Sequence, residues 1–118
     1  MLFDFQTFEK LTKHCYPEDH PYSLDEVLGV FRYYFEAYEQ HFDRPHPNIS
    51  MKQIRHIIQI MPFVTLEDRD GQTEDIPAEV YEDLIDCHFS TRYHRCDYNI
   101  NHFFSGRIRE YRFFEVFF

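Results

Sequence analysis

The sequence predicts a mainly α domain: a compact bundle of about five helices, in which residues 63–76 form either one small β-hairpin or an acidic loop. Three observations support this class. Apolar residues recur at helical spacing in several stretches, and helix-capping residues stand before these stretches. The 118 residues also include only 3 glycines, which are too few for the turns of a multi-stranded sheet. We expect one domain covering residues 1–118.

Each of the first two helices begins at a capping residue. Asp4 precedes apolar residues at helical spacing, which predicts a helix over residues 4–15. Ser23 stands three residues before Glu26 in the pattern of a capping box. An apolar stripe with a 3.6-residue period follows it for about five turns and predicts a long helix. The stripe consists of Leu24, Val27, Leu28, Phe31, Tyr34, Phe35, Tyr38 and Phe42.

The third helix lies between proline-containing segments. Pro45 and Pro47 exclude a helix from the segment around them, and Ser50 and Gln53 form a second capping box. A short amphipathic helix then ends at Pro62. After it, residues 63–66 are strand-like and residues 70–71 are an Asp-Gly dipeptide, which is typical of a hairpin turn.

The C-terminal third predicts two further helices. Pro77 suits the first turn of a helix whose buried face carries Val80, Tyr81, Leu84, Ile85 and His88. Asp97 is the expected cap of a last helix that reaches Tyr111. Gly106 interrupts this pattern, so residues 107–118 are predicted to be either helical or extended.

Negative charge is concentrated in one segment. The chain has a net charge of -9, and residues 66–86 hold nine carboxylates against a single arginine, Arg69. Such a segment creates a negative potential that attracts a basic partner and repels nucleic acid. A solvated acidic helix face would show the same pattern without any partner. The nine residues are Glu67, Asp68, Asp70, Glu74, Asp75, Glu79, Glu82, Asp83 and Asp86.

Other chemistry is weakly supported. Placing Gly71 at the sixth position of a calcium loop puts Leu66 and Pro77 where ligands are needed. The cluster Cys87, His88, His94, Cys96 and His102 offers zinc-type ligands at a spacing that matches no finger or knuckle pattern. Phosphate-loop, nucleophile-elbow and metalloprotease patterns do not occur in the sequence. We therefore expect no enzyme, no cofactor and no metal.

The principal alternative is a nucleic-acid-binding regulatory domain. It would use cations on the third helix together with C-terminal arginines that alternate with aromatic residues, a composition typical of stacking surfaces. The residues concerned are Lys52, Arg55, His56, Arg107, Arg109 and Arg112. The acidic segment that follows the third helix would repel phosphates, which counts against direct binding.

A third interpretation is a homodimer sealed by surplus aromatic side chains near the C-terminus. These are Phe113, Phe114, Phe117 and Phe118. No two of the three cysteines form a Cys-x-x-Cys pair. The sequence also shows neither a signal-peptide pattern nor an apolar run long enough to span a membrane. A cytoplasmic protein without membrane partners is therefore expected.

The sequence thus favours a small acidic protein-interaction domain whose surface around residues 66–86 docks on a basic site of another protein. A nucleic-acid-binding protein is the expected kind of partner. The chain would then be an inhibitor that mimics nucleic acid, by analogy of size and charge with anti-restriction and anti-CRISPR proteins.

Overall fold

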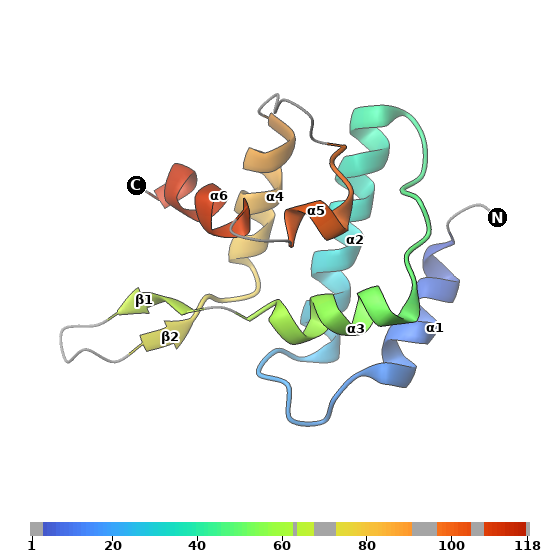
Figure 1. The fold of residues 1–118 in the computed structure, drawn as a ribbon, viewed down its shortest axis with the longest axis horizontal. Coiled ribbons are helices and arrows are strands. Elements are labelled where there is room, and N and C mark those ends of the chain that lie inside the picture. The colour runs from blue at the N-terminus through green and yellow to red at the C-terminus, as the bar shows by residue number, and fades with distance from the viewer. Residues whose placement is uncertain (1–3, 63, 68–72, 91–96, 105–107, 118) are drawn as a thin grey trace.

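The computed structural model describes residues 4–62, 64–67, 73–90, 97–104 and 108–117. Six helices and two short strands lie in these ranges (Figure 1). In chain order they are α1 (Phe5–Cys15), α2 (Leu24–Phe42), α3 (Met51–Ile60), β1 (Val64–Glu67), β2 (Thr73–Asp75), α4 (Val80–Ser90), α5 (Ile100–Phe103) and α6 (Ile108–Phe117). The mainly α class is confirmed, with one helix more than the sequence predicted.

The first three helices begin at the predicted capping residues. Asp4 Oδ1 accepts the Gln6 N–H at 3.1 Å. Ser23 Oγ accepts the Glu26 N–H at 3.1 Å, and the Glu26 carboxylate accepts the Ser23 N–H at 3.0 Å. Ser50 and Gln53 exchange the same pair of bonds at 3.2 Å and 2.8 Å. Both capping boxes therefore satisfy backbone donors that a helix start leaves without an intrahelical partner.

The extra helix comes from the C-terminal part of the chain. A single helix capped by Asp97 was predicted there, but α5 is four residues long and Asn99 is its cap. Asp97 lies two residues before this cap, and its Oδ1 accepts the Asn99 N–H at 3.0 Å, so it does not bind a backbone donor of the helix itself. From Ile108 the chain is again helical, so the extended alternative is wrong for residues 108–117. Packing of α6 against α4 buries Phe113 and stabilises this second helix.

The two strands pair antiparallel after α3. Val64 lies opposite Asp75 and Glu67 lies opposite Thr73, with an irregular register between Val64 and Leu66. The expected Asp-Gly turn at residues 70–71 lies outside the described residues. In Figure 1 the strands project from one side of the helical body.

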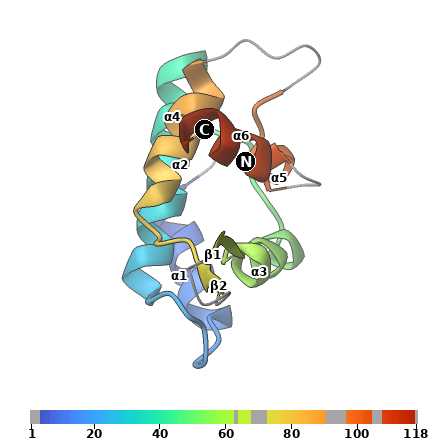
Figure 2. The same cartoon turned by 90° about the vertical axis from the view of Figure 1, so that its left-hand side faces the viewer.

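The helices form two layers around a shared core. Helices α2 and α4 pack side by side, α6 packs on α4, and α1 contacts both α2 and α3. Figure 2 shows α2 and α4 on one side of the molecule, with α3 and α5 on the other. The α2 residues Val27, Phe31, Tyr34, Phe35 and Tyr38 are buried between these layers, as the apolar stripe predicts.

No helix in the part of the chain that the structure describes is both long enough and apolar enough to cross a bilayer.

Buried tyrosines connect segments that are far apart in the sequence. The Tyr34 hydroxyl donates to the carbonyl oxygen of Tyr98 at 2.7 Å. Tyr22 donates to the carbonyl oxygen of Ile76, and Tyr81 donates to that of Met61. Each aromatic ring thus fills the core while its hydroxyl satisfies a loop or helix-end carbonyl that would otherwise be costly to bury.

A histidine and an arginine share the interior between α4 and α6. Arg112, which is 5% exposed, donates its Nε–H to Nδ1 of His88 at 3.1 Å, and His88 is fully buried. Only an uncharged imidazole with a free lone pair on Nδ1 accepts this bond. Burial, and then the positive charge of Arg112 and of His102, lowers the pKa of His88 to about 3.

Replacing Tyr34 by Phe should lower the free energy of unfolding by about 1 kcal/mol. The ring and its packing remain, but the hydrogen bond to Tyr98 is lost. Urea denaturation measures the change. A loss below about 0.3 kcal/mol would show that this hydrogen bond contributes little to the fold.

Acid should destabilise the fold through His88. Because the folded state disfavours protonated His88, stability is complete above the pKa of about 6.5 in the unfolded chain and declines as the pH falls toward 3. At pH 5 this single group should cost about 2 kcal/mol relative to pH 7.5. Denaturation of the wild type and of His88→Asn, which keeps an acceptor but does not titrate, should show a shallower pH slope in the variant. Equal slopes would contradict this assignment.

Candidate functional site

The fourth helix exposes a row of carboxylates. Tyr81, Leu84, Ile85 and His88 are buried against the core, so the opposite side of α4 faces solvent. The exposed side carries Glu82, Asp83 and Asp86, and Glu79 is exposed in the turn before the helix. In that turn the Val80 N–H donates to the Pro77 carbonyl at 3.0 Å. The sequence predicts Pro77 in the first turn of the helix, but α4 begins at Val80, so the proline lies in the turn before it.

Helix α2 adds two carboxylates that the sequence analysis did not assign to the site. A hollow of about 210 Å³ between the starts of α2 and α4 is lined by Asp25, Glu26, Glu79 and Glu82. Gly29 lies on its α2 side, where an added Cβ would meet no atom within 4 Å. The sequence analysis assigned Glu26 only to the capping box and gave Asp25 no role, because their distance from α4 in the sequence hid the association. We call Asp25, Glu26, Glu79, Glu82, Asp83 and Asp86 the acidic face.

A tyrosine from α2 connects to the far end of this face. The Tyr33 hydroxyl donates to Asp86 Oδ1 at 2.7 Å, which ties α2 to α4 at the surface. That hydrogen bond, with partial burial and the negative charges of Asp86, Glu82 and Asp83, raises the pKa of Tyr33 to about 12. The hydrogen bond to Asp86 is the largest cause of this shift, and the neighbouring carboxylates add to it.

The remaining acidic residues of the prediction are not all placed. Glu67 lies on β1, and Glu74 and Asp75 lie on β2, where they are located by the register of the strand pair. Asp68 and Asp70 lie outside the described residues. The structure therefore brings four of the nine predicted carboxylates together, three on α4 and Glu79 in the turn before it, and adds two from α2.

The cations of the nucleic-acid alternative separate into two groups. Lys52, Arg55 and His56 are exposed on α3, as predicted. Arg109 instead donates to the carbonyl oxygens of Ile60 and Met61 at the end of α3 and lies over the ring of Phe104.

Arg112 corrects the prediction further, because it is buried and donates to His88 in the core, while its ion pair is with the exposed Glu115. Arg107 lies outside the described residues. The two described C-terminal arginines thus stabilise the fold, since helix-end carbonyls and a buried imidazole need donors.

The structure describes three of the five cysteines and histidines that the sequence groups near residues 87–102. His88 belongs to the core, and the Cys87 thiol donates to Glu115 at 3.2 Å. His94 and Cys96 lie outside the described residues. Across the described ranges, no group of three or more potential ligands is arranged to hold a metal ion.

The aromatic dimer surface loses one of its four members. Phe113 is 3% exposed and belongs to the core, so it cannot contact a second copy. Phe118 and the side chains of Phe114 and Phe117 lie outside the described part of the structure. Dimerisation through them remains an expectation from the sequence.

Comparison with known proteins gives no relative: no family model, curated protein or solved structure matches the chain.

Replacing Asp86 by Asn should return the pKa of Tyr33 from about 12 toward its ordinary value near 10. The substitution removes the carboxylate that accepts the phenol proton and one of the nearby negative charges. NMR titration of the Tyr33 ring resonances measures the shift, and Glu36→Gln on another part of α2 serves as the control. An unchanged Tyr33 pKa in Asp86→Asn would contradict the described contact.

Proposed function

We propose that the acidic face docks on a basic site of a partner protein. The observation that carries the proposal is the convergence of exposed carboxylates from two helices around one hollow. A lysine or arginine side chain of the partner would enter this hollow, since its cation would meet carboxylates on both walls. Gly29 leaves room for the side chain because no Cβ projects there.

The electrostatics of the face predict fast and salt-sensitive association. Each exposed carboxylate contributes little alone, because water and salt screen it. Several of the same sign on one surface sum to a potential that steers a basic partner and disfavours acidic ones. Among the causes that raise the pKa of Tyr33 to about 12, the charges of Glu82 and Asp83 act in the same direction as the hydrogen bond to Asp86.

In the most specific form of this proposal, the partner is a nucleic-acid-binding protein and the chain is its inhibitor. Grooves that bind nucleic acid present lysines and arginines to a regular series of phosphates. Carboxylates held on a helix would occupy such a groove in place of the phosphates. Support for this form comes from the charge and its concentration on one face.

Charge reversal at the face tests the proposal. The triple variant Glu79→Lys, Glu82→Lys and Asp83→Lys should abolish capture of a basic protein from host lysate, while capture by the wild type should fall at high salt. A matched control reverses Glu18, Glu36 and Glu39, which are exposed elsewhere and give the same change in net charge. Circular dichroism verifies that both variants fold.

Three outcomes decide between the interpretations. Loss of capture in the face variant alone, together with release of the partner by excess duplex DNA, supports docking on a nucleic-acid groove. Equal loss in both variants, or capture that is insensitive to salt, would contradict the proposal. A mobility shift of random DNA or RNA by the wild-type chain would favour the nucleic-acid alternative and Lys52, Arg55 and His56 on α3.

A further inference from the structure

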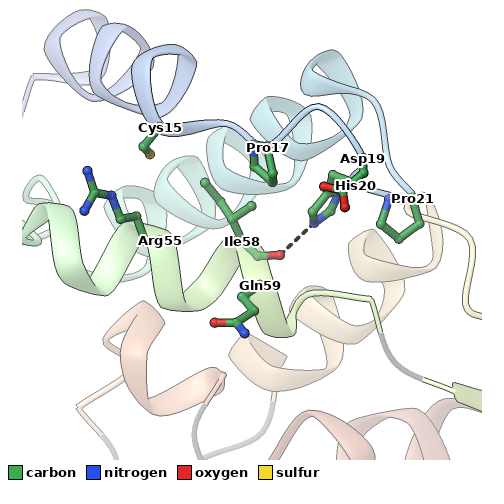
Figure 3. A pocket seen from close by; sticks show the side chains of 8 residues that line it. All are labelled: Cys15, Pro17, Asp19, His20, Pro21, Arg55, Ile58 and Gln59. Carbon is green, nitrogen blue, oxygen red and sulfur yellow. Dashed lines mark hydrogen bonds between the residues drawn. The ribbon is translucent and has the colours of Figure 1, made fainter.

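A second hollow lies on another part of the molecule, between α3 and the loop that joins α1 to α2 (Figure 3). Its volume is about 450 Å³, within the range of about 300–1,000 Å³ that small-molecule sites have. The residues that line it are Cys15, Pro17, Asp19, His20, Pro21, Arg55, Ile58 and Gln59. None of the residues of the acidic face is among them.

The loop wall of this hollow is held in place by His20. The Tyr22 N–H donates to Nδ1 of His20 at 3.1 Å, so the other ring nitrogen, Nε2, carries the proton and donates to the Ile58 carbonyl at 2.7 Å. The Tyr16 hydroxyl lies 3.0 Å from Nδ1 and donates to the Tyr22 carbonyl. With a proline on each side of His20, at positions 17 and 21, the wall is formed before any ligand arrives, which reduces the entropy cost of binding.

Opposite charges stand at the two ends of the hollow. Figure 3 shows Arg55 beside Cys15 at one end and Asp19 beside Pro21 at the other. Neither charged side chain forms an ion pair or hydrogen bond with the residues that the structure describes. Pro17 provides exposed apolar surface between them, Ile58 lines the hollow from the core with little exposed surface, and the Gln59 amide adds a neutral donor and acceptor one turn after Arg55.

We propose that this hollow binds a small zwitterion of dipeptide size. The ligand carboxylate would pair with the guanidinium of Arg55, whose planar donors match a carboxylate, and its ammonium group would pair with Asp19. The apolar middle of the hollow takes the ligand side chains. A simple anion would pair with Arg55 alone and make no use of the Asp19 carboxylate at the other end, so a zwitterion fits better.

The placement of the charges favours a dipeptide over a single amino acid. Asp19 lies on the loop side of the hollow, whereas the Arg55 guanidinium extends from α3 toward Cys15 at the other end (Figure 3). An α-amino acid carries both charges on one carbon, whereas the free termini of a dipeptide are separated by its full length.

Calorimetry with three probes tests the proposal: the dipeptide Ala-Leu, its N-acetylated form and its C-amidated form. Ala-Leu should bind the wild type with a Kd of about 1 mM or tighter. Each blocked form should bind about tenfold more weakly, because it lacks one of the two charges. Arg55→Gln and Asp19→Asn should each weaken Ala-Leu binding by a similar factor.

The combination of blocked ligands and variants gives the decisive comparison. Amidation should cost no further affinity in Arg55→Gln, and acetylation should cost none in Asp19→Asn. Lys52→Gln and Glu18→Gln, which remove exposed charges that do not line the hollow, should bind as the wild type does. Binding weaker than about 10 mM, or equal binding of blocked and free dipeptides, would overturn the proposal, as would unchanged affinity in the Arg55 and Asp19 variants.

Discussion

The arrangement of the helices depends on the burial of aromatic side chains whose polar ends must find partners. Helix α2 places Phe31, Tyr34 and Phe35 in the core, and a buried hydroxyl without an acceptor would cost about 1–3 kcal/mol. Tyr34 meets this requirement at Tyr98, as Tyr81 does at the end of α3. These bonds fix where the loop before α5 and the end of α3 lie relative to α2 and α4.

The same constraint determines which charges reach the surface. Because Tyr81, Leu84 and His88 fix the inner side of α4, its carboxylates must point outward, next to those of α2. Arg109 is half-buried and donates to the end of α3, and Arg112 is buried and donates to His88. These two arginines therefore do not pair with the carboxylates of α4. The negative charge of α4 stays exposed on the surface and forms part of the acidic face.

Local patterns predicted the helices well and the site in part. Capping boxes at Ser23 and Ser50 are short-range signals, so the starts of α2 and α3 could be read directly from the sequence. The roles of Arg112 and Asp25 depend on contacts between distant segments, and no local spacing encodes them. A single helix was predicted in this region because the apolar periodicity continues from Ile100 to Tyr111, whereas α5 ends at Phe103 and α6 begins at Ile108.

The measurement that tests the central claim most directly is an amide-resolved NMR titration of the labelled chain with the partner recovered by capture. If the acidic face is the docking surface, the largest shift changes will fall on residues 25–33 and 79–86, and they will shrink as salt is added. Changes centred on α3, or changes that persist undiminished at high salt, would contradict the account.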